Sequence, residues 1–239
     1  MAHSSLQIIR LASVDSTQRH AAALADSGAA DGTVVVTDTQ TAGRGRRGRV
    51  WQDVPGASVL MSMILRSPLP VAQLPTISIA AGVAVAEALA EVANIDARLK
   101  WPNDVQVHGR KIAGVLLERH GEAVILGIGI NVTRDAVPAD VEAQATSIER
   151  ETRRDHEDVR VERDAVLVAV VDALGQWRAR LERQGFEPVR ARWTALAGML
   201  GREVRVEEIV GIARGLDTDG ALLVETTHGL TRVLAGDVV

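Results

Sequence analysis

The sequence predicts an α+β fold, with helices packed on a β-sheet and a small all-β module after them. Three observations support this prediction. Short apolar segments of strand length are concentrated between residues 97 and 132, segments with helical spacing flank them, and only short strands follow Gly198. We therefore expect a larger α+β domain at residues 1–197 and a β domain at 198–239.

The first half of the chain alternates between helices and strands. Asp15-Ser16-Thr17 is predicted to cap a helix that ends near Ser27, before Gly28. The Ala-rich stretch Ile77–Val92 predicts a buried helix. His-Gly pairs at 108–109 and 120–121 predict tight hairpin turns. Strands are predicted at residues 33–38, 57–65, 98–101, 105–107, 111–118 and 123–131.

The second half begins with polar residues 133–160, which predict a long connection or flexible loop, and the charges of 149–164 suggest a solvated face. Two helices are predicted at 162–183 and 186–196, and four short strands at 203–207, 210–216, 221–226 and 230–234. A module of about forty residues buries too little to fold alone, so we expect it to be docked on its neighbour.

Composition excludes several classes of protein. The 239 residues carry a net charge of −4, which argues against a general nucleic-acid-binding surface. No cysteine is present, so disulfides, zinc–thiolate sites and thioester intermediates are excluded, and the six histidines lack metal-ligand spacing. The sequence shows no signal peptide and no run of ~18 apolar residues, so we expect a cytoplasmic protein outside the membrane.

The strongest local signal is the segment Gln40-Thr41-Ala42-Gly43-Arg44-Gly45-Arg46-Arg47-Gly48-Arg49. Glycines allow close approach of the backbone to a ligand, and arginines donate forked hydrogen bonds to carboxylate and phosphate oxygens. Trp51 follows as a candidate stacking surface. The alternative is a solvated basic loop that touches RNA, and composition alone leaves both readings open.

Two further segments carry candidate polar and glycine positions. Lys100-Trp101-Pro102-Asn103-Asp104 ends a strand in a turn, and Lys111 then lies among apolar residues, although lysine stems often lie along apolar surface without a function. Gly127 and Gly129 alternate along a strand and leave one face without side chains, which would make room for a flat ligand. The alternative is that they mark a simple bulge. Ser16 and Thr17 need no function beyond capping a helix.

In order, these segments resemble the bacterial biotin–protein ligases, from about Ser13 to the C-terminus, including Gly211–Asp217 and Gly236-Asp237 in the β module. The resemblance implies the mixed sheet shared with class II aminoacyl-tRNA synthetases, followed by an SH3-like β-barrel. It also implies that ATP and biotin are substrates, that Mg²⁺ assists, and that a biotin carboxyl carrier protein accepts the biotin. A homodimer stays open.

The resemblance assigns roles to residues of this sequence. Ser16, Thr17 and Gln40 would bind the ureido end of biotin, and Lys111 would meet its carboxylate. Lys111, Arg44 and Arg46 would be catalytic. The biotin site as a whole would comprise Ser16, Thr17, Gln18, Gln40, Gly43, Arg44, Gly45, Arg46, Lys111, Gly114, Gly127 and Gly129. The nucleotide side would comprise Arg46, Arg49, Trp51, Asn103 and Asn131.

Two departures from the family pattern matter. The family usually has Asn where this chain has Gln18. Many members also carry an N-terminal DNA-binding domain of about sixty residues, whereas fifteen residues precede Ser16 here, so no repressor role and no DNA partner are expected.

Two rivals to the ligase remain. A lipoate or octanoate ligase shares the fold, but the arginine-rich motif followed by Gly-Gly and the His-Asp pair of that family are absent from the sequence. A non-catalytic nucleic-acid-binding protein would use the arginine loop. The acidic net charge and the scarcity of aromatic residues argue against this second rival.

Overall fold

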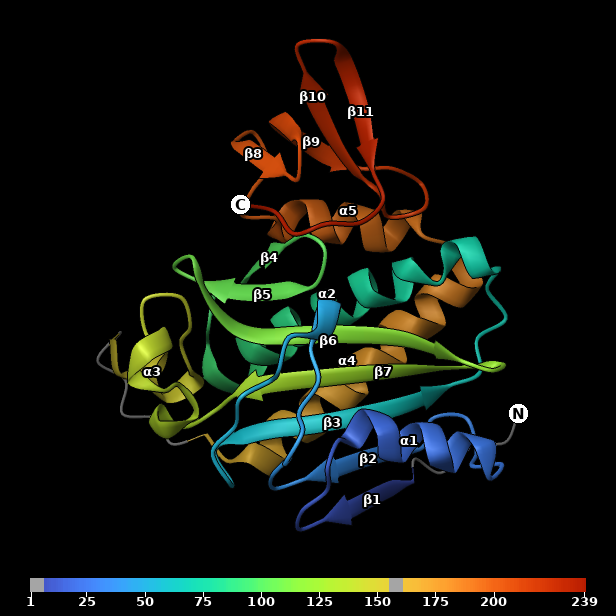
Figure 1. Ribbon diagram of the computed structural model, residues 1–239, viewed down its shortest axis with the longest axis vertical. Helices are drawn as coiled ribbons and strands as arrows, with labels where there is room; N and C mark the ends of the chain where they lie inside the picture. The colour runs from blue at the N-terminus through green and yellow to red at the C-terminus, as the bar shows by residue number, and fades with distance from the viewer. Residues whose placement is uncertain (1–6, 155–160) are drawn as a thin grey trace. The chain divides into compact units, whose positions relative to one another are not determined.

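The computed structural model describes residues 7–154 and 161–239 and confirms the predicted fold class (Figure 1). Seven strands form a mixed sheet in the order β1-β2-β3-β7-β6-β5-β4, and four form a small antiparallel sheet in the order β11-β10-β9-β8. Of the described residues, one compact unit holds 7–68, 112–154 and 161–167, and a second holds 69–111 and 168–239. The predicted division at residues 197 and 198 stays a prediction.

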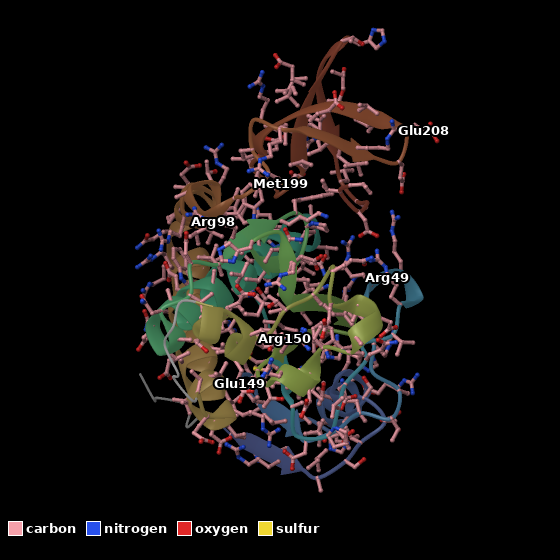
Figure 2. The ribbon with its side chains drawn as sticks, turned by 90° about the vertical axis from the view of Figure 1, so that its left-hand side faces the viewer. Arg49, Arg98, Glu149, Arg150, Met199 and Glu208 are labelled. Atoms are coloured by element: carbon pink, nitrogen blue, oxygen red, sulfur yellow. The ribbon has the colours of Figure 1, made fainter. Side chains whose placement is uncertain are left out.

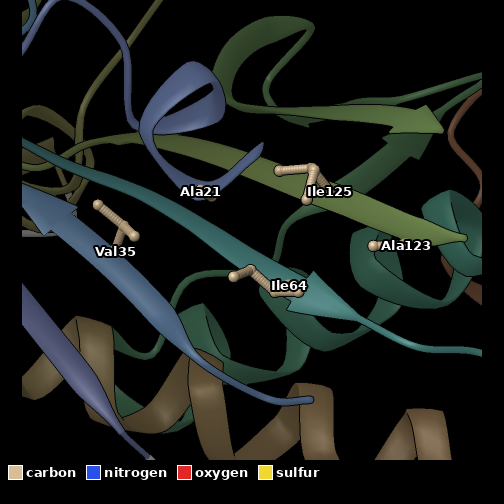
Figure 3. Packing of buried hydrophobic residues seen from close by; sticks show 5 residues of the cluster. All are labelled: Ala21, Val35, Ile64, Ala123 and Ile125. Carbon is tan, nitrogen blue, oxygen red and sulfur yellow. The ribbon is translucent and has the colours of Figure 1, made fainter. Parts of the chain in front are cut away.

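The first unit has α1 packed on strands of the large sheet. Its elements are β1 (Ile8–Leu11), α1 (Thr17–Asp26), β2 (Val34–Thr37), β3 (Ser58–Leu65), most of β6 (Arg110–His120), β7 (Ala123–Asn131) and α3 (Ile148–Arg154). β1 pairs with β2 in parallel, whereas β2–β3, β3–β7 and β6–β7 are antiparallel. Ala21 of α1 packs with Val35, Ile64, Ala123 and Ile125 of the sheet (Figure 3). All eight residues of β3 are buried, which explains why the strand is apolar apart from Ser58 and Ser62.

The second unit combines long helices with the small sheet. Its elements are α2 (Pro75–Ala93), β4 (Arg98–Lys100), β5 (Asp104–Val107), most of α4 (Arg163–Gln184), α5 (Glu187–Leu196), β8 (Glu203–Val206), β9 (Ile209–Leu216), β10 (Leu222–Thr226) and β11 (Gly229–Val233). α2 contacts β4, β5 and α5, and α5 contacts β9, so the small sheet is docked on helices of its own unit.

The helix α2, with the short turn before it, is the one span among the described residues long and apolar enough to cross a membrane. Of its most apolar 18-residue window, 72% is buried inside the structure, so α2 is a core helix. Pro75 begins it, two residues before the predicted start, because proline fits the first helical turn.

Two elements were missed by the sequence analysis. The strand β1 was not predicted. The predictions of a loop at 133–160 and of a solvated face at 149–164 were wrong where α3 forms. Ile148, Glu151 and Thr152 of α3 are at most 3% exposed, so this face of a charged helix is buried. Residues 155–160 of the predicted loop lie outside the described residues. The predicted turns are confirmed, since His108 and Gly109 both take positive φ and His120 pairs with Ala123 across two residues.

Candidate active site

In the first unit, a chain of buried hydrogen bonds joins the start of α1 to the centre of the sheet. The Ser62 hydroxyl on β3 lies 2.9 Å from Thr17 Oγ1 and 3.1 Å from Gln18 Oε1, and it can donate its single proton to one of them at a time. Gln40 Oε1 accepts from Thr17 N at 2.8 Å and from Thr17 Oγ1 at 3.1 Å. Ser62, Thr17 and Gln18 are at most 4% exposed, so the network is worth more than its surface equivalent would be.

Ser16 stands out within this cluster. Its side chain is fully buried and, although it occupies the N-cap position of α1, its hydroxyl makes no capping bond. Among the described residues, Ser16 Oγ has no hydrogen-bond partner. A buried hydroxyl without a partner is costly, so this atom suits a polar group of a ligand.

Beside Ser16, the Asp15 carboxylate fixes the start of the helix. Arg19 Nη1 lies 2.8 Å from Asp15 Oδ2, and Ser16 N donates to Asp15 Oδ1 at 2.6 Å. These two contacts hold the pKa of Asp15 below its ordinary value of 3.8, and the hydrogen bond from Arg19 has the larger effect.

Both ends of the Gln18 side-chain amide form hydrogen bonds within the protein. Its Nε2 donates to the Ile125 carbonyl at 2.9 Å, while its Oε1 accepts from Ser62. Both bonds stabilise the protein itself. The predicted contact of Gln18 with biotin stays a prediction.

The predicted glycines allow the Gln18 and Trp51 side chains to approach the sheet closely. A Cβ on Gly127 would lie 2.5 Å from Gln18 Oε1, and one on Gly129 would lie 2.6 Å from the Trp51 ring. Gly114, which is buried, pairs with Gly129 in the sheet. A Cβ on Gly43 would lie 2.4 Å from the Trp51 carbonyl oxygen. Each of these approaches is closer than any side chain allows, so glycine is required.

The arginine segment folds into a small loop rather than an open basic tail. Arg44 and Val50 form a β-bridge, Gly45 N donates to the Arg49 carbonyl at 2.8 Å, and a 3₁₀ turn spans Arg46–Gly48. The Arg44 guanidinium lies 2.7 Å from the Glu118 carboxylate of β6. Arg49 is exposed (Figure 2). The loop therefore presents part of its positive charge to solvent, where a phosphate could reach it.

Asn131 lies at the end of β7 and is 6% exposed. Its side-chain Nδ2 donates to the Thr146 carbonyl at 3.0 Å. The Thr146 hydroxyl in turn donates to the buried Glu151 carboxylate of α3. This arrangement fixes the Asn131 amide by way of α3, the helix that the sequence analysis missed.

The remaining predicted site residues, Asn103 and Lys111, belong to the second unit. Lys111 Nζ lies 2.6 Å from Asp104 Oδ1, and the two side chains are 32% and 27% exposed. The half-buried ammonium is therefore oriented by a carboxylate, unlike a lysine whose stem merely covers apolar surface. Asn103 is half-buried in the turn before Asp104.

Sequence reasoning missed Ser62, Glu118, Thr146 and Glu151. A signal existed for Ser62, which is a polar residue inside an otherwise apolar strand. Glu118, together with Gln18, Arg44 and Ile125, also borders a cavity of about 450 Å³ between α1 and β6. The part of the chain that the structure describes holds no group of three or more His, Cys, Asp or Glu side chains suited to a metal ion.

The comparisons identify the family. The model of the biotin/lipoate A/B protein ligase family matches residues 11–135, and that of the biotin protein ligase C-terminal domain matches 199–239. The bifunctional ligase/repressor of Bacillus subtilis is 34% identical over 236 residues, which cover 94% of this chain and 71% of the relative. The biotin–[acetyl-CoA-carboxylase] ligase of Paracoccus denitrificans is 35% identical over 242 residues, covering 95% of this chain and 98% of that protein.

A solved structure agrees with these sequence matches. The biotin protein ligase from Aquifex aeolicus, in complex with biotin and ATP, superposes with a TM-score of 0.87 at 30% identity, over 98% of this chain and 97% of that one. The chain therefore belongs to the biotin/lipoate A/B protein ligase family. Within the family it is a biotin protein ligase, so the first rival, a lipoate ligase, is set aside.

Proposed function

We propose that the residues of this site join biotin to ATP as biotinyl-5′-AMP and pass the biotin to a lysine of the carrier protein of acetyl-CoA carboxylase. The carrier is proposed because the Paracoccus denitrificans relative bears that substrate in its name. The observation that carries the residue assignment is the glycine floor bordered by buried polar groups, with the Ser16 hydroxyl lacking a partner among the described residues.

At the biotin end, Ser16, Thr17 and Gln40 would hold the ureido group. Gln40 Oε1 already accepts two bonds from Thr17, which leaves Nε2 as the group with which Gln40 donates to a ligand. Gly127, Gly129 and Gly114 would floor the pocket, and Gly43, Arg44 and Gly45 would border the chain of biotin.

In the first step, a carboxylate oxygen of biotin attacks the α-phosphorus of ATP. The bond from that phosphorus to the oxygen bridging the β-phosphate breaks, and pyrophosphate leaves. Two anions must be brought together, so fixed cations at the reacting oxygens lower the barrier. Lys111, oriented by Asp104, would meet the carboxylate, and Arg46 with Arg44 would offset charge on the phosphoryl oxygens.

The nucleotide would be held by Arg49, Trp51, Asn103 and Asn131. We propose that Mg²⁺ enters on the triphosphate, because this ion is commonly bound through substrate phosphates and one or two carboxylates. The lack of a three-ligand cluster among the described residues fits an ion carried in this way. Asp104 is the carboxylate that stands beside Lys111.

In the second step, the neutral amine of a carrier lysine attacks the acyl carbon of biotinyl-AMP. The bond between that carbon and the phosphate oxygen breaks, AMP leaves, and the amine loses a proton. No covalent enzyme intermediate is required, which agrees with a chain that contains no cysteine.

The test is exchange of labelled pyrophosphate into ATP, measured with biotin, with lipoate and with neither. Exchange that depends on biotin, and transfer of biotin to the acetyl-CoA carboxylase carrier, support the proposal. Exchange with lipoate alone, or in no condition, would contradict it. We further propose a cytoplasmic location, where both substrates are made available to a soluble enzyme.

A further inference from the structure

In the second unit, Trp101 ties the Lys-Trp-Pro-Asn-Asp segment to the small terminal sheet. Trp101 is 2% exposed, and its indole Nε1 donates to the Gly220 carbonyl at 3.0 Å. Its backbone N–H points at the Met199 sulfur at 3.2 Å. Trp101 thus contacts the entry to the terminal module through its backbone and the turn between β9 and β10 through its side chain.

The turn that receives the indole is held firmly. Gly220 has φ of +87°, and its N–H donates to the Asp217 carbonyl at 3.1 Å. The Arg232 guanidinium pairs with Asp217 and lies 2.6 Å from Asp219. A Cβ on Gly220 would be 3.6 Å from Ile79 of α2, so the turn packs against that helix. The Gly220 carbonyl is therefore a fixed acceptor.

The neighbouring strand is attached at a second point. Leu99 of β4 forms a parallel bridge with Ala197, and the Leu99 carbonyl accepts from Gly198 N at 3.1 Å. Arg98 and Met199 accordingly lie close together in Figure 2. Residues 197–199, which lead into the terminal module, thus run along the β4 strand.

The same short hairpin carries the carboxylate that orients the candidate catalytic lysine. β4 and β5 are paired from Lys100 to Asp104, so Trp101 and Asp104 stand at the two sides of one tight turn. Asp104 Oδ1 lies 2.6 Å from Lys111 Nζ. Trp101 and Asp104 therefore share the backbone of one short turn.

We infer that Trp101 is a positioning residue, through which docking of the terminal module sets the place of Asp104 and hence of the Lys111 ammonium in adenylate formation. The inference rests on the proposed function for the role of Lys111. It gives the terminal module a part in the first step of the reaction, although the module would supply no group that touches biotin through this route.

The test compares two tryptophan-to-phenylalanine variants of the full chain. Trp101→Phe removes the N–H to Gly220. Trp177→Phe is the matched control, because Trp177 is 6% exposed and its Nε1 donates at 2.6 Å to Glu87 of α2 rather than to the terminal module. Rates are measured with biotin and ATP in a single turnover, at a temperature where unfolding curves show each variant folded.

Trp101→Phe should slow adenylate formation by about tenfold to a hundredfold, as small misplacements of catalytic groups do. The rate constant should fall while the KM for ATP changes little, and transfer from preformed biotinyl-AMP to carrier should persist. Trp177→Phe should lose stability and keep its rate. A Trp101→Phe rate equal to that of the wild type would overturn the inference, while absence of exchange in the wild type would instead defeat the proposed function.

A double variant isolates the route. If Trp101 acts through Asp104, Trp101→Phe with Asp104→Asn should be no slower than Asp104→Asn alone, whereas independent effects multiply. Multiplying effects would overturn the inference. If Trp101→Phe does not fold, Arg232→Gln takes its place, because it loosens the Asp217–Gly220 turn. Its rate is measured alone and together with Asp104→Asn, and the same outcomes support or overturn the inference.

Discussion

Replacement of Gly127 by alanine tests the packing within the proposed biotin site. The new Cβ would lie 2.5 Å from Gln18 Oε1, 3.4 Å from Gln18 Cδ and 3.5 Å from Ser62 Oγ. The Gln18 amide cannot simply swing away, because Ile125 and Ser62 hold its two ends. Either the amide breaks a bond or the strand shifts.

The magnitude follows from these alternatives. Overpacking a well-filled site costs about 1–3 kcal/mol, and a lost buried hydrogen bond about 0.5–1.5 kcal/mol. The backbone freedom that alanine removes from the unfolded chain returns about 0.4–1 kcal/mol. We therefore expect Gly127→Ala to lower the free energy of unfolding by about 2 kcal/mol and to weaken biotin binding.

Urea unfolding and calorimetric titration with biotin measure the two effects. Gly175→Ala is the control, because a Cβ at this position in α4 meets nothing within 4 Å, and alanine should stabilise the helix by about 1 kcal/mol. In a double-mutant cycle, Gln18→Ala should relieve Gly127→Ala, with a coupling of about 0.5–3 kcal/mol. Additive losses would show that the Gln18 amide is not what the new methyl group strikes.

Three further outcomes follow from the structure. Lys111→Ala should form biotinyl-AMP far more slowly while its unfolding curve changes little, and a wild-type rate would reduce this lysine to a surface residue. Amide exchange in residues 42–49 should slow when biotin or its adenylate binds, because ligand offsets the repulsion among arginines; equal exchange would indicate a preformed loop. Burial raises the pKa of Asp219, but bonds from Ala221 N and Arg232 together hold it below 3.8. Its contribution to stability is therefore complete above pH 3.8 and is lost as the pH falls through the lower pKa of the folded state, which a carboxyl NMR titration would detect.

Most elements could be predicted because their sequence patterns match how they are buried. β3 and β7 are apolar runs that are buried almost throughout, and α2 is a buried helix. α3 could not be predicted, because its seven residues include one apolar side chain, Ile148. The buried Glu151 carboxylate of α3 accepts a hydrogen bond from the Thr146 hydroxyl five residues earlier, and apolar periodicity does not reveal such a bond.

The site was predictable where a residue type has one physical use. Gly43, Gly127 and Gly129 were identified from sequence, and each proves to have no room for a Cβ. Ser62 was not identified, because its importance depends on register. It pairs with Gly127 across β3 and β7, and only that pairing brings it beside the start of α1.

A substitution at Gln40 can change the side-chain Nε2, which we propose faces the ligand, and keep the Oε1 that accepts from Thr17. Gln40 Oε1 accepts from Thr17, and Nε2 is the donor that we propose for the ureido oxygen of biotin. Gln40→Glu keeps an acceptor for Thr17 and replaces that donor with an oxygen. We expect the unfolding free energy to change little and biotin affinity to fall about tenfold or more, because two acceptors would then face each other. Calorimetry measures the affinity, with Gln40→Ala as a control that should lose both stability and binding. Gln40→Glu that binds biotin as tightly as the wild type would show that this amide does not donate to the substrate.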